Sequence, residues 1–278
     1  MAVDGAKLVQ YYSAACICSP SRGALMTGRT FGRIGVYPGV FSPNSVGGLP
    51  LNETTVAERL KTVGYVTGMC GKVGASPCDA TPTPIPAALR PLSLKLCRVG
   101  CMGTTQWHLG TNEYLPMHRG FDTYFGAPMT QNECYSNIIA PGSTRKGGSF
   151  GPCPQFNGSS ALPWKQSSGI FPDDPDAVDM VNVDEAYDTD AANVVKRAHA
   201  AGDPFFYYFA SHHTHAPQFA ACQSACDERG DDCLSNCTSR RGLFGDSLGL
   251  LDRSVGRMHA LLEELEISNN TLTIYSAE

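Results

Sequence analysis

The sequence predicts an α/β fold in which helices flank a mostly parallel central sheet. Three segments, residues 52–72, 184–215 and 248–278, repeat one order: a helix, an apolar strand and then polar residues. Such alternation is typical of parallel sheets, because two parallel strands need a crossover connection. In these sheets the active site lies beyond the carboxyl ends of the strands. We therefore expect the polar residues after each strand to gather at one edge.

The first of these segments carries clear helix signals. Thr55 and Glu58 have the spacing of a capping box, and Gly64 suits the end of the helix. One face of this helix is apolar and consists of Val56, Leu60 and Val63. The apolar run 65–70 follows as a strand, and Lys72 stands just beyond its end.

The other two segments follow the same plan. A helix over 184–201 precedes the strand 204–210, which leads into the histidine-rich stretch S-H-H-T-H. Before the strand 271–277, apolar residues recur in helical steps of three and four: Leu248, Leu251, Val255, Met258, Leu262 and Leu265. A fourth strand is expected at 7–12, ahead of a short cysteine-containing motif.

Composition narrows the class of protein. The 278 residues are 42% hydrophobic and carry a net charge of −5, without a basic stripe, which argues against a nucleic-acid partner. No apolar run reaches the roughly 18 residues of a membrane span. Twelve cysteines indicate an oxidising compartment or bound metal. Four N-x-S/T sites add candidate glycans: Asn52, Asn157, Asn236 and Asn269. The first residues, M-A-V-D-G-A-K, do not have the pattern of a signal peptide.

The stretch C-S-P-S-R-G-A-L-M-T-G, residues 18–28, predicts a short helix with an anion site at its start. Ser19 can cap the helix, Pro20 fits its first turn and Gly28 fits its end. Cys18 then precedes the helix, and Arg22 lies one turn along. A helix N-terminus beside a guanidinium group favours a bound anion.

The same stretch matches the sulfatase signature C-x-P-S-R-x-x-x-L/M-T-G throughout. Further segments resemble the arylsulfatase A branch of the type I, formylglycine-dependent sulfatases, including T-V-A-E-R-L, W-H-L-G, H-R-G-F-D and P-F-F-Y-Y-F-A-S-H-H-T-H-A-P-Q-F. The resemblance covers nearly the whole chain. It implies an alkaline phosphatase-like sulfatase N-terminal domain, here incomplete, that hydrolyses aryl, sugar or lipid sulfate monoesters.

The resemblance also implies residue roles. A separate maturation enzyme would oxidise Cys18 to formylglycine, whose hydrate attacks sulfur while Arg22 orients it and the anion. Lys72 and Thr130 would contact the substrate. His108 would assist collapse of the covalent intermediate, and His215 would touch the sulfate and protonate the leaving oxygen. Fixed cations and a proton donor stabilise the charge that develops during S–O cleavage.

A calcium site is implied as well. Cys18 and Glu278 fall at ligand positions, whereas the family's Asp-Asp pair would precede residue 1. We therefore expect residues 1–278 to be a partial catalytic domain that holds Ca²⁺ poorly and is inactive in this form. The complete protein is expected to be lysosomal or secreted, with its signal peptide upstream.

Two regions interrupt the family pattern. Residues 73–106 separate Lys72 from Trp107, which are adjacent in the family motif G-K-W-H-L-G. This proline-rich segment begins with Val, whose codons start GT, and ends with Gln, one of whose codons ends AG. Our hypothesis is a retained in-frame intron. The alternative is a real surface insertion with disulfides among Cys78, Cys97 and Cys101.

The second region, 221–241, contains two C-x-x-x-C pairs. On two short helices this spacing places each pair on one face, so that disulfides would join Cys222 to Cys237 and Cys226 to Cys233. Zinc binding is the rival interpretation. Cys134 and Cys153 are expected to close another loop, although connectivity cannot be deduced from sequence.

Two other functions stay open from the sequence. Relatives with the same signature act on phosphorus, so a phosphonate or phosphodiester hydrolase is the enzymatic alternative. A catalytically dead, cysteine-rich glycoprotein that binds sulfated ligands is the non-enzymatic one. The retained Cys18, Arg22 and His215 argue against the second alternative, because a binding module needs no oxidisable cysteine.

Overall fold

A five-stranded sheet organises the computed structural model, which describes residues 5–36, 41, 48–72, 112–126, 156–158, 160–161, 183–215 and 240–277. The strand order is β4-β3-β2-β1-β5. β1 (Val66–Gly71) runs parallel to both its neighbours, β2 (Thr123–Gly126) and β5 (Phe205–Ala210). The short strands β3 (Phe156–Asn157) and β4 (Ser160–Ala161) continue the sheet in antiparallel pairing. The predicted mostly parallel α/β sheet is confirmed.

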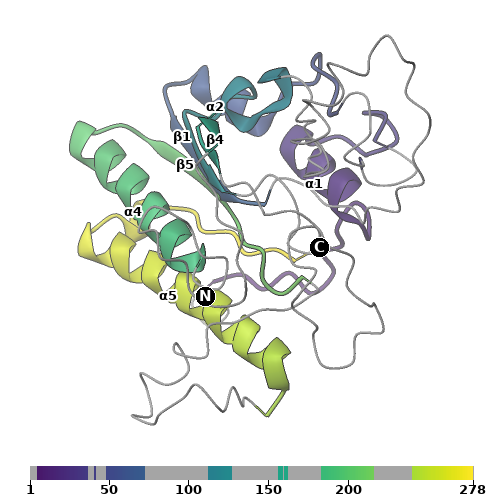
Figure 1. The fold of residues 1–278 in the computed structure, drawn as a ribbon. Helices are drawn as coiled ribbons and strands as arrows, with labels where there is room; N and C mark the ends of the chain where they lie inside the picture. Colours follow the sequence, from purple (N-terminus) through teal and green to yellow (C-terminus); the bar gives the residue numbers. More distant parts are fainter. Residues whose placement is uncertain are drawn as a thin grey trace.

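Helices cover both faces of the sheet (Figure 1). α1 (Cys18–Thr27) and α2 (Val56–Lys61) lie on one side, whereas α4 (Val183–Ala201) and α5 (Gly242–Glu264) lie side by side on the other. Three short 3-10 helices complete the described elements: η2 (Asn112–Tyr114), η3 (Pro116–His118) and η8 (Ser268–Asn270).

Alternate residues of β1 enter the two cores. Met69 packs with Met26 and other apolar residues on the α1 and α2 side. Cys70, the next residue, packs with Val183 and Tyr187 under α4. Because successive side chains of a strand point to opposite faces, a strand covered on both faces is buried along nearly its whole length. Burial of β1 from its second residue onward follows this rule.

Local signals place α2 as the sequence predicts. The Thr55 side chain accepts a hydrogen bond from the Glu58 N–H at 3.1 Å, and the Glu58 carboxylate accepts one from the Thr55 N–H at 2.7 Å. The expected apolar contact of Val63 is wrong, since this side chain is 65% exposed. The helix ends at Lys61, and Gly64 at φ 87° then turns the chain toward β1 before Val63 can face the core.

Two predicted strands are absent from the sheet. Residues 7–12 and 271–277 are described without strand pairing, and their apolar side chains are exposed, as with Leu8 at 71% and Ile274 at 77%. An apolar sequence favours an extended chain, but a strand forms only where its N–H and C=O groups meet a neighbouring strand. The predicted helix that precedes 271–277 is present; it begins at Gly242, ahead of Leu248, the first residue of the predicted apolar pattern, and it buries Leu250 and Leu261.

The predicted insertions fall largely outside the described part of the chain. Residues 73–106 and 221–239 are not described, so the domain boundaries and the intron hypothesis stay predictions. Among the helices that are described, none is both long and apolar enough to cross a membrane.

Candidate active site

Cys18 is the first residue of α1 and is buried. The preceding residue, Ile17, is extended (φ −144°, ψ 146°) and makes no side-chain cap. The prediction that Ser19 caps the helix is wrong: its hydroxyl lies inside the first turn and accepts a hydrogen bond from the Phe41 N–H at 3.2 Å. The predicted end is confirmed, because Gly28 adopts φ 66° and its N–H bonds to the Ala24 carbonyl.

Lys72 brings a buried ammonium group to this thiol. Its Nζ lies 3.3 Å from Cys18 Sγ, and the residue is only 2% exposed. The backbone N–H of Lys72 donates to the Ala210 carbonyl at 2.7 Å, which joins the carboxyl ends of β1 and β5. The bend before it needs a glycine, since Gly71 has φ 89° and a Cβ there would collide with the Ala210 carbonyl.

Arg22 is the second cation near Cys18. We use the name cation site for Cys18 together with the two cations beside it, Arg22 and Lys72. One turn along α1, its guanidinium donates to the Lys72 carbonyl at 3.2 Å and to the Tyr208 hydroxyl at 3.2 Å. Two cations and the N-terminus of a ten-residue helix therefore surround one position. Such an arrangement stabilises an anion or an oxygen that gains negative charge.

Tyr208 is a member of the site that the sequence analysis missed. It stands in the apolar strand β5 and looks like a core residue. Strand alternation supplies a signal, because Tyr208 and Phe206 share the face that packs toward the α1 side. Its partner Arg22 is 186 positions away, a separation that no local pattern reveals.

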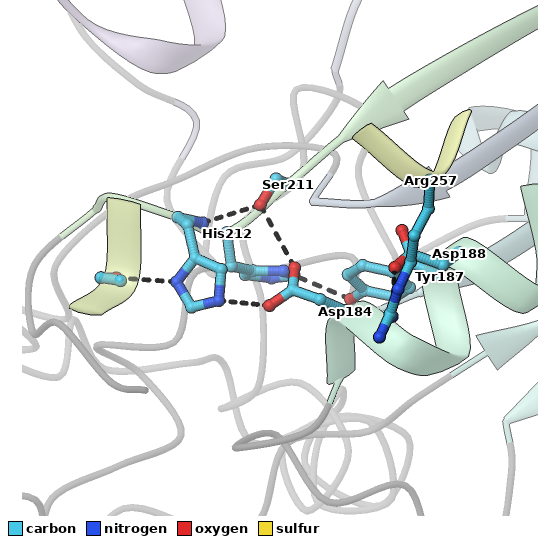
Figure 2. Close-up of polar contacts among 8 residues, drawn as sticks. Asp184, Tyr187, Asp188, Ser211, His212 and Arg257 are labelled. Atoms are coloured by element: carbon cyan, nitrogen blue, oxygen red, sulfur yellow. Dashed lines mark hydrogen bonds and ion pairs between the residues drawn. The ribbon is translucent and has the colours of Figure 1, made fainter. Parts of the chain in front are cut away.

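The histidine-rich stretch forms a turn directly after β5. His215 is half-buried, and its N–H donates to the His212 carbonyl at 3.0 Å. His212 and His213 are buried, and their rings contact α4 (Figure 2). Because Ala210 ends β5 and binds the Lys72 backbone, this turn and the cation site leave the same edge of the sheet.

Several predicted residues lie outside the described residues. These are His108, Thr130, Glu278 and Asn236, and the cysteines Cys78, Cys97, Cys101, Cys134, Cys153, Cys222, Cys226, Cys233 and Cys237. The other three glycosylation candidates, Asn52, Asn157 and Asn269, are exposed, as a glycan requires. Cys16, two residues before Cys18, is an exposed free thiol.

The described residues do not by themselves fit a calcium ion. No group of three or more His, Cys, Asp or Glu side chains gathers among them as metal ligands. Calcium takes oxygen ligands and is repelled by cations, and the Lys72 ammonium group lies 3.3 Å from Cys18 Sγ. Of the two predicted ligands, only Cys18 is within the described ranges.

Comparison with known proteins gives the family. The Sulfatase family model matches residues 1–277. The chain is 33% identical to arylsulfatase A of Homo sapiens over 283 residues and 29% identical to N-acetylgalactosamine-6-sulfatase of Canis lupus familiaris over 288 residues. All of the chain is covered in both cases, but only 45% and 44% of those relatives, so it spans less than half their length.

A solved structure supports the same fold. The crystal structure of Ps i-CgsB in complex with k-i-k-neocarrahexaose aligns with a TM-score of 0.58 at 21% identity, and the alignment covers 92% of this chain and 46% of that one. The family model covers residues 1–277, and the two curated relatives align with the whole chain. The similarity in sequence and the similarity in fold therefore point to the same family. The chain belongs to the sulfatase family.

Proposed function

We propose that this protein hydrolyses sulfate monoesters through a formylglycine made from Cys18. One observation carries the proposal: Cys18 Sγ lies 3.3 Å from the buried Lys72 Nζ, at the start of the helix that also presents Arg22. In the mature protein an oxygen of the hydrated aldehyde would stand where this sulfur stands. The proposed partners are a sulfate ester and a separate maturation enzyme that oxidises Cys18.

The cation site suits both the nucleophile and the substrate. A sulfate ester carries one negative charge and gains more on its bridging oxygen as the S–O bond breaks. The buried Lys72 ammonium and the Arg22 guanidinium, held by Tyr208, are preorganised to meet this charge without reorganisation. Lys72 binds the sulfate, and Arg22 orients the diol and the anion.

The proposed reaction has two steps. One hydroxyl of the diol releases its proton to water as its oxygen attacks sulfur, the bond from sulfur to the alcohol oxygen breaks, and the leaving oxygen takes a proton from His215, which regains one from water before the next cycle. The sulfated diol then loses its second hydroxyl proton, with assistance from His108, and releases sulfate as the aldehyde re-forms. Water restores the diol. One water molecule is thus consumed for each ester that is hydrolysed.

The substrate class and the setting are part of the proposal. We propose an aryl, sugar or lipid sulfate as substrate, with Thr130 at its contact surface, and a lysosomal or secreted location. Exposed Asn52, Asn157 and Asn269 support passage through the secretory route. Sulfatases typically use Ca²⁺ as well, and Glu278 is the proposed ligand besides residue 18.

The test uses the protein with whatever sequence its transcript encodes on either side of these residues, produced in a host that contains the maturation enzyme. Mass spectrometry of the peptide with Cys18 should show an aldehyde in place of the thiol. Turnover of para-nitrophenyl sulfate should exceed that of para-nitrophenyl phosphate. Cys18→Ala should abolish sulfate turnover, whereas the matched control Cys16→Ala removes an exposed thiol and should retain it.

Other outcomes point to the alternatives. Faster turnover of the phosphate ester would favour a hydrolase that acts on phosphorus. An unmodified Cys18 in protein from a competent host, with neither ester hydrolysed, would favour a glycoprotein that only binds sulfated ligands.

A further inference from the structure

A second polar cluster lies under the histidine turn. The His213 ring stands between two helices: Nε2 bonds to the Asp184 carboxylate of α4, and Nδ1 lies 2.8 Å from Ser247 Oγ of α5. We call Asp184, His213 and Ser247 the buried triad. Their exposed fractions are 4%, 8% and 0%. Figure 2 shows how the chain after β5 and the two helices meet there.

The residue types of the buried triad are those of a nucleophilic triad, but its burial excludes that role. Ser247 has no exposed surface, so no substrate reaches its hydroxyl. An ionised carboxylate only accepts, so Nε2 carries a proton toward Asp184; in a neutral ring Nδ1 then accepts from Ser247. Both ring nitrogens are engaged, which fixes the orientation of the imidazole.

Further contacts extend this anchor to the whole turn. The Ser211 hydroxyl accepts a hydrogen bond from the His213 N–H at 3.0 Å. The Tyr187 hydroxyl lies 3.2 Å from His212 Nδ1, and the two rings stack with centroids 5.9 Å apart. The His215 N–H bonds in turn to the His212 carbonyl at 3.0 Å. Ser211 also donates to the Asp184 carboxylate at 3.5 Å, so each residue from 211 to 213 contacts α4 or α5, and the backbone of His215 is held to His212.

We propose that Asp184 and Ser247 are positioning residues for His215, acting through His213. The proposal rests on the proposed function, in which His215 gives a proton to the leaving oxygen. Asp184 and Ser247 fix the imidazole of His213 from two sides, and this fixes the turn on which His215 approaches the substrate. Neither residue touches the substrate. An error of about 1 Å in the place of a reacting group can lower turnover about a hundredfold.

The experiment compares two variants with two matched controls in the matured protein. Asp184→Asn keeps the shape of the side chain but removes its charge, and Ser247→Ala removes the hydroxyl. Asp188→Asn changes a buried carboxylate one turn further along α4, which binds Arg257 at 2.8 Å. Ser254→Ala removes a buried hydroxyl two turns further along α5, which bonds to Asp188. Neither control touches the turn through the contacts described above.

Asp184→Asn should lower kcat for para-nitrophenyl sulfate by about 10- to 100-fold, and Ser247→Ala by less. KM should change little, because proton donation occurs only in the transition state. In both controls kcat per folded molecule should stay unchanged, whatever the direction in which the substitution shifts the melting temperature. Equal kcat values in variants and controls would overturn the proposal, as would a loss of turnover in the variants that a smaller amount of folded protein fully explains.

A second measurement keeps the inference separate from the proposed function. With isotopically labelled histidine rings, the NMR signal of His215 is assigned by its disappearance in His215→Gln. Asp184→Asn and Ser247→Ala should broaden or double this signal, and Ser254→Ala should not. If the wild-type protein hydrolyses no sulfate ester, the proposed function fails, and an unchanged His215 signal in both variants would then refute the positioning role as well.

Discussion

Two buried thiols lie in opposite electrostatic surroundings. Cys18 has the Lys72 ammonium 3.3 Å away and Arg22 one turn along the same helix. Cys70 lies under α4, on the other side of the sheet, among carboxylates. Burial raises the pKa of Cys70 well above its ordinary value; a hydrogen bond with Tyr207 opposes this, and the carboxylates of α4, Asp190, Asp188 and Asp184, raise it further.

The difference shows that the two faces of the paired strands β1 and β5 have opposite electrostatic surroundings. On the α1 side, two cations, Lys72 and Arg22, gather beside Cys18. On the α4 side, carboxylates of α4 join this helix to its neighbours: Asp190 accepts a hydrogen bond from Tyr207 of β5, and Asp188 binds Arg257 of α5. A thiol on this second side stays protonated and inert. The side of the sheet on which a cysteine lies therefore decides whether cations or carboxylates surround its thiol.

The largest effect should come from removing the cation beside Cys18. Lys72→Gln keeps most of the side-chain volume but removes the charge, so kcat for sulfate ester turnover should fall by about 100- to 1,000-fold. The control Lys196→Gln removes a half-exposed lysine of α4, 3.6 Å from Glu264, and should leave turnover unchanged. Comparable turnover in the two variants would show that the contrast between the two thiols has no catalytic meaning.

A smaller effect is expected at Gly71, which separates Cys70 from the cation site. Gly71→Ala forces a positive φ on alanine and places its Cβ against the Ala210 carbonyl, so it should destabilise the fold by about 2–4 kcal/mol. Gly64 has a similar φ of 87° with open space around it, and Gly64→Ala should lose only about 1 kcal/mol. Urea unfolding measures both values, and equal losses would contradict the close packing of β1 on β5.

Local signals explain which parts of the fold could be predicted from the sequence. The capping box of Thr55 and Glu58 and the apolar runs of β1 and β5 identified their elements, because each signal lies within a few residues. β2, β3 and β4 were missed, since segments of two to four residues have no period to recognise. Residues 7–12 and 271–277 had the apolar pattern, but pairing depends on distant segments.

The same reasoning applies to the candidate site. Cys18, Arg22 and Lys72 came from a motif and from strand ends, and the structure brings all three together. Tyr208, Asp184 and Ser247 were not singled out, because each fits an ordinary strand or helix pattern. Asp184 and Ser247 meet His213 across 29 and 34 positions. Such partners follow from the packing of α4 and α5 on the turn, which no short stretch of sequence encodes.

The smallest effects concern two carboxylates on opposite sides of the sheet. For Asp122, burial would raise the pKa, but hydrogen bonds from Lys61 and Thr67 outweigh it and hold the pKa below the ordinary 3.8. For Asp190, burial raises the pKa, and bonds from Tyr207 and the charge of Arg197 offset this only in part. When the pKa of a carboxyl is lower in the folded than in the unfolded protein, its ionised form stabilises the fold at pH values above the unfolded pKa. When the pKa is higher in the folded protein, the ionised form destabilises the fold at neutral pH.

The two asparagine variants should therefore shift stability in opposite directions. At neutral pH, Asp122→Asn should destabilise the protein by about 0.2–1 kcal/mol, because the partner Lys61 is half-exposed, whereas Asp190→Asn should stabilise it. The Asp190 difference should shrink as the pH falls through the raised pKa of Asp190 toward 3.8, whereas the Asp122 difference should shrink only below 3.8, as the pH falls through the lowered pKa of Asp122. Urea unfolding at several pH values gives the two curves. If both variants changed the free energy of unfolding in the same direction at neutral pH, the proposed electrostatic contrast between the two sides of the sheet would be wrong.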